Sequence, residues 1–193
     1  AMTGIIAHRG FNGLYPENTR RAFEEALKLD IAGIECDVNL TADGQVVVIH
    51  DLTVDRTSDG SGEVAQMPLD ELRQLNIGTE EDPQQIMLLD ELLTLLDQYP
   101  GKHILIETKH PSPFGAALEE AVADVLRANG MEADERVHLI SFNPEAIQRF
   151  HRLLPELETF LLADDSFAPV GDCGAGPSVR LAKAQPELLD GRF

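Results

Sequence analysis

The sequence is poor in cysteine and aromatic residues, and it has no tryptophan and no long apolar run. Two cysteines, Cys36 and Cys173, are too few for a disulfide framework, and Cys36 lies in a strand-like segment where a free buried thiol is common. No stretch has the length of a membrane span, and the apolar residues 4–7 are too short for a signal peptide. We therefore expect a cytoplasmic protein without stable membrane association.

Basic residues are also scarce, because 15 lysines and arginines stand against 34 acidic residues and give a formal net charge of −19. Such a charge repels nucleic acid, so we expect no nucleic-acid partner. An anionic ligand would have to be attracted by a bound cation or by a few local basic side chains. The glycine patterns of phosphate loops and nucleophile elbows are absent as well.

The length of 193 residues suits one substantial hydrophobic core and leaves little room for two. We therefore expect a single domain over residues 2–193. Ala1 precedes Met2 and looks like the remnant of an expression tag, so we take Met2 as the native start. The sequence gives no indication of an oligomeric state.

Short β-branched runs alternate with amphipathic stretches along the chain. The spacing predicts strands at 5–8, 33–38, 46–50, 103–108, 137–142 and 159–162. It predicts helices at 20–29, 88–98 and 114–129, and a weaker one at 144–154. Alternating strands and helices indicate an α/β fold with a parallel sheet and right-handed crossovers.

Two regions interrupt this alternation. Residues 39–45 contain the turn pair Asp43-Gly44, and seven residues favour a hairpin because a parallel crossover normally needs a dozen or more. Residues 52–85 are rich in turn residues and predict an excursion over one end of the fold, with a short helix at 69–75. This excursion is either an ordinary solvated loop or a binding loop.

Two acidic residues share one face of a predicted strand. Strand periodicity places Ile34, Cys36 and Val38 on one face and Glu35 and Asp37 on the other. If both carboxylates are buried, their repulsion calls for a compensating cation, and a divalent metal is the simplest one. The alternative is that both acids face solvent on a half-exposed strand.

The segment 104–109 ends in a second acidic position. Glu107 and Lys109 share a face at the carboxyl end of a strand, which is where parallel sheets bind ligands. Glu107 could complete an oxygen-rich site with Glu35 and Asp37, and carboxylate ligands favour Mg²⁺ or Ca²⁺ over zinc. The alternative is an internal ion pair between Glu107 and Lys109 without a metal.

Two histidines, His8 and His50, each end a predicted strand. Histidine exchanges protons near neutral pH, so a pair suits acid-base cleavage of a P–O bond. Arg9 offers a planar fork of donors for phosphate oxygens, and Gly10 allows close approach of the backbone. A histidine on an apolar strand is more often a satisfied core residue. We assign that role to His103, His110, His138 and His151.

Six short motifs occur in an order and spacing that resemble the glycerophosphodiester phosphodiesterase (GDPD) family, within the phosphatidylinositol-phospholipase-C-like phosphodiesterase superfamily. The resemblance runs from about residue 5 to residue 142, and six motifs in register are more specific than any one of them. The motifs are His8-Arg9-Gly10, Pro16-Glu17-Asn18-Thr19, Glu35-Cys36-Asp37-Val38, His50-Asp51, Asp55-Arg56-Thr57 and Glu107-Thr108-Lys109.

The resemblance implies a (β/α)8 TIM-type barrel and an enzyme that hydrolyses a small glycerophosphodiester to glycerol 3-phosphate and an alcohol. It implies two steps, in which a substrate hydroxyl attacks phosphorus to form a cyclic phosphate that water then opens, with one divalent cation, Mg²⁺ or Ca²⁺, as cofactor. The implied roles are acid-base catalysis by His8 and His50, metal binding by Glu35, Asp37 and Glu107, and phosphate binding by Arg9 and Lys109.

The chain is short for this fold, since a (β/α)8 barrel typically has about 250 residues. Only six strands are predicted, and the tryptophan-containing late strand of the family has no counterpart. We therefore expect strands 7 and 8 to be missing through truncation; closure by another chain is the alternative. In the family, the motif that corresponds to Glu35-Cys36-Asp37 is followed just as closely by the His-Asp motif. The resemblance therefore favours 46–50 as the third barrel strand over the hairpin.

Two other functions remain open at this point. A lysophospholipase D-like phosphodiesterase would use residues 52–85 to shape a mouth for a lipid substrate. A non-catalytic phosphate-ester binding protein would follow from an incomplete barrel, although the intact set of histidines and acids argues against it. Substrate profiling separates the first alternative, and binding without turnover would indicate the second.

Overall fold

The computed structural model describes residues 4–163 and 179–181. Two residues interpreted from the sequence, Ala1 and Cys173, lie outside these ranges. Cys36 lies inside them and is a buried free thiol, as the sequence predicts.

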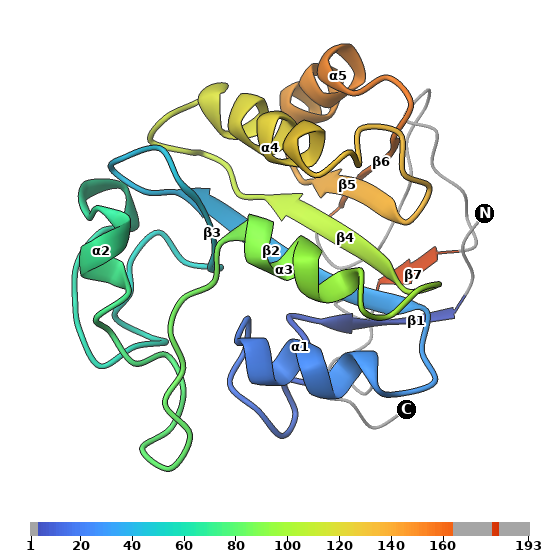
Figure 1. Cartoon of the computed structure of the whole chain (residues 1–193). Helices are drawn as coiled ribbons and strands as arrows, with labels where there is room; N and C mark the ends of the chain where they lie inside the picture. Colours follow the sequence, from blue (N-terminus) through green and yellow to red (C-terminus); the bar gives the residue numbers. More distant parts are fainter. Residues whose placement is uncertain (1–3, 164–178, 182–193) are drawn as a thin grey trace.

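The core of the structure is a largely parallel sheet (Figure 1). Its strand order is β6-β5-β4-β2-β1-β7, and every pairing along this path is parallel. The strands on the path are β1 (Gly4–His8), β2 (Gly33–Leu40), β4 (His103–Thr108), β5 (Val137–Ser141), β6 (Glu158–Leu161) and β7 (Val179–Leu181). Within the described residues, six parallel strands thus form part of an eight-stranded barrel, which confirms the expected incomplete (β/α)8 fold class.

One strand does not belong to the parallel path. Strand β3 (Val46–Val48) pairs antiparallel with β2, and Val38 lies opposite Val48. Gly44 makes the turn with a φ of 75°, and its backbone N–H donates to Thr41 O at 3.0 Å. The placement of 46–50 as the third barrel strand was therefore wrong. The hairpin predicted from turn chemistry is correct, because so few residues cannot carry a parallel crossover.

The strand after residue 162 was not predicted. β7 pairs in parallel with β1 on the side away from β2, and Ile5 lies opposite Arg180. Among residues 4–163 and 179–181, six strands lie on the parallel path, as many as predicted, but one member differs: β3 is not on the path and β7 is. The sequence signal for β7 is weak because the strand is only three residues long.

The long helices match their predictions to within three residues at each end. They are α1 (Arg20–Leu27), α3 (Leu89–Leu96), α4 (Ala117–Ala128) and α5 (Pro144–Leu153). Thr19 caps α1 by accepting the backbone N–H of Ala22, and the Asn143 side chain caps α5 in the same way. Among the described residues, no helix is long and apolar enough to cross a membrane.

The two faces of the sheet are packed differently. Ile34, Cys36 and Val38 point to the helix side and join the large core cluster with residues of α1, α3 and α4. The opposite face forms the barrel interior, where a smaller cluster includes Ile6 and Leu105. Side chains alternate along a strand, so Glu35 and Asp37, which lie between these three residues of β2, point into the barrel interior.

The excursion at 52–85 is a folded element with its own small core. It contains a 3-10 turn (Val64–Gln66) and helix α2 (Leu69–Leu72), which is shorter than the helix predicted at 69–75. Its apolar residues pack around Val47 and Ile49. Figure 1 shows α2 beyond the arrowheads of β2 and β4, so the excursion covers the carboxyl end of the sheet.

Candidate active site

Three buried carboxylates meet at the carboxyl end of two neighbouring strands. Asp37 of β2 lies opposite Glu107 of β4 in the parallel register, and Glu35 lies two residues earlier on the same face. One ligand oxygen from each residue lies within 4.8 Å of the others. The exposed fractions of Glu35, Asp37 and Glu107 are 0, 0 and 1%. The alternative in which Glu35 and Asp37 face solvent is therefore wrong.

Two cationic side chains border this acidic cluster. Arg9 Nε lies 3.2 Å from Asp37 Oδ2, and Lys109 Nζ lies 2.8 Å from Glu107 Oε2. The backbone N–H of Arg9 also donates to Glu35 Oε1 at 3.3 Å. The predicted ion pair between Glu107 and Lys109 is thus present, but it is one part of a larger cluster.

The cluster fits a hard cation. Three buried carboxylates so close together repel one another, and a bound cation relieves this repulsion. Among the described residues, the buried Asp37 Oδ1 has no hydrogen-bond partner. An oxygen-only donor set with an oxygen to spare suits Mg²⁺ or Ca²⁺.

His8 enters the site from the end of β1. It lies opposite Glu35 in the parallel register, and its Nε2 is 3.7 Å from Glu35 Oε1. The chain then turns sharply, with φ values of 59° at Arg9 and 82° at Gly10. A Cβ atom at Gly10 would lie 2.7 Å from the backbone carbon of Ala22, so only glycine fits this turn.

His50 reaches the same end of the sheet through the hairpin. The antiparallel return brings the backbone N–H of Ile49 to within 3.0 Å of Asp37 O. Asn39 Nδ2 donates to Ile49 O at 2.8 Å and holds the segment after β3 in place. The sequence predicts His50 at the end of a barrel strand; instead, the hairpin carries it back beside Asp37. Both histidines therefore lie at the end of the sheet that holds the acids.

Four further polar residues surround the site, and no role was predicted for them. Asn18, with a φ of 56°, donates from Nδ2 to Asp37 Oδ2 at 3.2 Å. Glu17, Asp51 and Arg56 form ion pairs next to the histidines and Arg9. All four belong to the short motifs that resemble the family, and that membership was the available signal.

Neighbouring charges favour the ionised forms of Asp51, Glu17 and Lys109, which border the site. A hydrogen bond from Arg56 is the main reason that the pKa of Asp51 falls from 3.8 to about 2. Burial raises the pKa of Glu17, but hydrogen bonding to Arg56 and the charge of Arg9 outweigh burial, and the net pKa is lowered. Burial lowers the pKa of Lys109, but the charges of Glu107 and Asp37 raise it by more.

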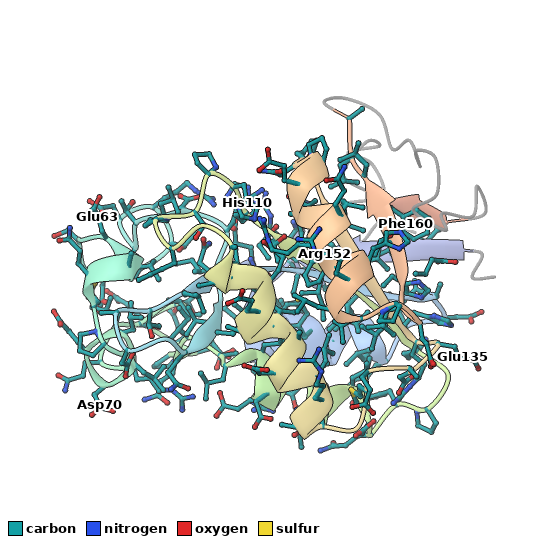
Figure 2. The ribbon with its side chains drawn as sticks, turned by 90° about the horizontal axis from the view of Figure 1, so that it is seen from above. Glu63, Asp70, His110, Glu135, Arg152 and Phe160 are labelled. Carbon is teal, nitrogen blue, oxygen red and sulfur yellow. The ribbon has the colours of Figure 1, made fainter. Side chains whose placement is uncertain are left out.

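The remaining histidines have partners outside this site, as the sequence predicts. His103 and His138 contact each other at the opposite end of the sheet, with Nδ1 of His103 2.8 Å from Nε2 of His138. His110, labelled in Figure 2, pairs with Glu119 at 2.7 Å. The Nε2 atom of His151 lies 3.3 Å from the Thr159 hydroxyl.

Comparisons with known proteins point to one family. The sequence model of the glycerophosphoryl diester phosphodiesterase family matches residues 8–176. A protein of Mycobacterium tuberculosis named "Probable glycerophosphodiester phosphodiesterase 1" is 36% identical over 208 residues, which cover 96% of this chain and 76% of that protein.

Solved structures give the same answer. The glycerophosphodiester phosphodiesterase of Agrobacterium tumefaciens is similar with a TM-score of 0.72 and 33% identity, covering 83% of this chain and 67% of that one. A phosphodiesterase of Oleispira antarctica, solved in complex with the product sn-glycerol-3-phosphate, is similar with a TM-score of 0.77 and 32% identity. The match covers 83% of this chain and 66% of that one. The chain thus spans about two thirds of the length of these structures.

Proposed function

Because the chain belongs to the glycerophosphoryl diester phosphodiesterase family, we propose that it hydrolyses glycerophosphodiesters to glycerol 3-phosphate and an alcohol. We further propose that the reaction depends on a divalent cation, Mg²⁺ or Ca²⁺. The observation that supports both statements best is the cluster of three buried carboxylates at the carboxyl end of β2 and β4.

Glu35, Asp37 and Glu107 would hold the cation. When bound, a divalent cation neutralises charge that develops on the phosphate oxygens and favours ionisation of the attacking hydroxyl. The protein's own contribution is a rigid set of oxygens on adjacent strands, already collected within 4.8 Å. Arg9 and Lys109 each contact one of these acids, and both can donate to a phosphate that arrives beside the acidic cluster.

His8 and His50 are the proposed acid-base pair. In the first step, one histidine accepts the proton of a glycerol hydroxyl as its oxygen forms a bond to phosphorus. The P–O bond to the alcohol breaks, and the other histidine donates a proton to that leaving oxygen. In the second step, the roles reverse as water adds to phosphorus and the cyclic ester opens to glycerol 3-phosphate.

The direct test measures the release of glycerol 3-phosphate from glycerophosphocholine. We expect turnover in Mg²⁺ or Ca²⁺, loss of turnover in excess chelator, and recovery when the cation is restored. Turnover that persists in chelator would reject the cation requirement. No turnover with any glycerophosphodiester in either cation would reject the proposed activity.

A second candidate is hydrolysis of lysophospholipids at the same site. It is favoured by three exposed apolar side chains, Leu14 (72% exposed), Phe114 (37%) and Phe142 (37%). They lie in the segments that follow β1, β4 and β5, which open at the same end of the parallel sheet. Phe142 lies next to the site, because Lys109 Nζ is 6.0 Å from the centre of its ring.

Substrate profiling separates the two candidates. A lysophospholipid substrate would be turned over with a higher kcat/KM than glycerophosphocholine, and the double variant Phe114→Ser/Phe142→Ser would reduce only the lipid reaction. Tyr99→Ser is the control, because Tyr99 is a half-buried aromatic residue in the segment that leads into β4, at the amino end of the sheet. Equal loss on both substrates would reject a role of these phenylalanines in lipid binding.

A further inference from the structure

One arginine of the excursion joins two carboxylates that border the candidate site. Arg56 contacts Asp51 through Nε–Oδ2 at 2.9 Å and Nη2–Oδ1 at 3.1 Å. It also contacts Glu17 through Nη1–Oε1 at 2.8 Å and Nη2–Oε2 at 2.9 Å. Both contacts are bidentate, which requires the planar fork of a guanidinium group and fixes the orientation of both carboxylates.

Asp51 in turn orients the imidazole of His50. Its Oδ1 lies 2.7 Å from Nδ1 of His50. The pKa of Asp51 is lowered to about 2, so at neutral pH the carboxylate is ionised and can only accept a hydrogen bond. Nδ1 of His50 must therefore carry the hydrogen, and Nε2 is left as the nitrogen that can exchange a proton with substrate.

Glu17 likewise orients the guanidinium group of Arg9. Its Oε2 lies 3.1 Å from Nη1 of Arg9, and Nε of Arg9 lies 3.2 Å from Asp37 Oδ2. Arg9 thus reaches from Glu17 to the acidic cluster. A continuous set of contacts links the proposed acid-base histidine to the proposed phosphate-binding arginine, and Arg56 is the central member.

We propose that Arg56 is a positioning residue that fixes the tautomer and orientation of His50 through Asp51 and the orientation of Arg9 through Glu17. This inference rests on the proposed function of the same site. It gives the excursion a specific role, because the residue that aligns these two groups comes from the excursion and not from the barrel.

A purely structural role for Arg56 makes a different prediction. Its side chain is 51% exposed, and exposed ion pairs contribute little to the free energy of unfolding. If Arg56 only fastened the excursion to the barrel, its removal would change stability slightly and leave the chemistry intact. Arg73 supplies the matched control, because it is also in the excursion and pairs with Glu91 at 2.8 Å, away from the acids and histidines.

The kinetic test compares Arg56→Ala, Arg56→Lys and Arg73→Ala in the full chain with the cation present. We expect kcat to fall by about 100-fold in Arg56→Ala, in line with the effect of misplaced catalytic groups. Lysine should restore little, because it cannot form two bidentate contacts, whereas added guanidinium chloride at low millimolar concentration should restore part of the rate of Arg56→Ala. Arg73→Ala should remain within threefold of the parent and should not respond to guanidinium.

A second measurement does not depend on activity. Nitrogen NMR of the imidazoles reports which ring nitrogen carries hydrogen, and a His50→Gln spectrum identifies the signals of His50. We expect the parent and Arg73→Ala to show His50 with hydrogen on Nδ1. Arg56→Ala should show a mixture of tautomers, because Asp51 stays ionised but is no longer held against Nδ1. If the parent has no activity, the proposed function fails, while this result still tests the positioning role.

Two results would overturn the inference. One is a tautomer of His50 that is the same in Arg56→Ala as in the parent. The other is a kcat for Arg56→Ala that lies within threefold of Arg73→Ala, with no response to guanidinium.

Discussion

Strand β4 carries a polar group at each end, and the two ends differ in how completely those groups are satisfied. At its amino end, His103 contacts His138 of β5, and His138 contacts Glu158 of β6 through Nδ1 at 2.8 Å. Near its carboxyl end, Glu107 joins two more acids from β2. Figure 2 shows these two ends far apart: Glu135, two residues before β5, lies at one end of the molecule, and the excursion residues Glu63 and Asp70 lie at the other.

The amino end forms a closed chain of hydrogen bonds. With Glu158 as acceptor, His138 donates from Nδ1 and accepts at Nε2 from Nδ1–H of His103, so each contacting nitrogen has a consistent role with both rings neutral. Burial and the charge of His103 lower the pKa of His138 from 6.5 to about 4. These residues therefore need no further ligand.

The carboxyl end is not closed in this way. Three buried carboxylates converge there beside Arg9, Lys109 and His8, and Asp37 Oδ1 lacks a hydrogen-bond partner within the described part of the chain. A cavity is no guide by itself, because one of about 350 Å³ at the amino end is lined by His103, His138 and acidic neighbours. The convergence of three buried carboxylates, and not the presence of histidine and acid or the size of a cavity, distinguishes the candidate site.

Replacing histidines at the two ends gives the largest expected difference. His8→Ala and His50→Ala should each lower kcat by about 100-fold or more, because each removes a proposed acid-base group. His138→Ala should leave kcat within a few fold once the rate is divided by the folded fraction. Steady-state release of glycerol 3-phosphate measures all three, and circular dichroism gives the folded fraction. A loss in His138→Ala equal to that of His50→Ala would remove the distinction between the ends.

Cation binding should stabilise the protein only through the carboxyl end. A ligand that binds the folded state at 100 times its Kd raises the free energy of unfolding by about 2.7 kcal/mol. Asp37→Asn should lose most of this increase in Mg²⁺ or Ca²⁺, because Asp37 contributes a buried oxygen that has no hydrogen-bond partner among the described residues. Urea unfolding with and without cation measures the effect.

Glu158→Gln is the control for this experiment. It changes an acid of the amino end and should retain the full cation-dependent increase, even if its basal stability is lower. An equal loss of the increase in both variants would show that the cation binds elsewhere.

The amino end should instead govern stability against acid. Because the folded-state pKa of His138 lies below the unfolded value, the unfolded chain binds more protons, and stability is lost as the pH falls below about 6.5. Between pH 7 and 5 the shift from 6.5 to about 4 corresponds to a loss of about 2 kcal/mol. Burial raises the pKa of Glu158, which acts in the opposite direction and reduces the net loss.

Urea unfolding at pH 7 and pH 5 tests this expectation. The parent should lose more stability between the two values than His138→Gln, which cannot take up the proton. His151→Gln is the control, because His151 is a half-buried histidine of α5 whose Nε2 atom lies 3.3 Å from the Thr159 hydroxyl. An equal pH dependence in the parent and in His138→Gln would contradict the role of the buried imidazole.

Strand periodicity and local turn chemistry account for what could be predicted from the sequence. The alternation of side chains along a strand predicts that Glu35 and Asp37 share one face of the sheet. Glu107 ends an apolar run, which predicts that it lies at the same end of the sheet as these two acids. The pair Asp43-Gly44 predicted the hairpin correctly, and the error came from giving the family resemblance more weight than the turn.

The contacts that were missed join residues that are distant in sequence. Arg56 and Glu17 are separated by 39 positions, and His103 and His138 by 35. Neither pair follows a local periodicity, because each depends on the register between strands or on the fold of the excursion. The short strand β7 was missed for a related reason, since its three residues gain their structure from pairing with β1.

The smallest expected effect concerns Cys36, which lies between two of the acids but points to the helix side of β2. Burial raises the pKa of this thiol well above its usual value, and the charges of Glu35, Asp37 and Glu107 raise it further. Since the thiolate is the reactive form, a disulfide reagent should not label Cys36 in a folded Cys173→Ser variant, and labelling should proceed at the rate of unfolding. Cation bound at the acids should slow labelling further, because it stabilises the folded state, whereas the same cation should have no effect in Asp37→Asn. Rapid labelling in the folded protein would mean that the helix face of β2 opens independently of the site.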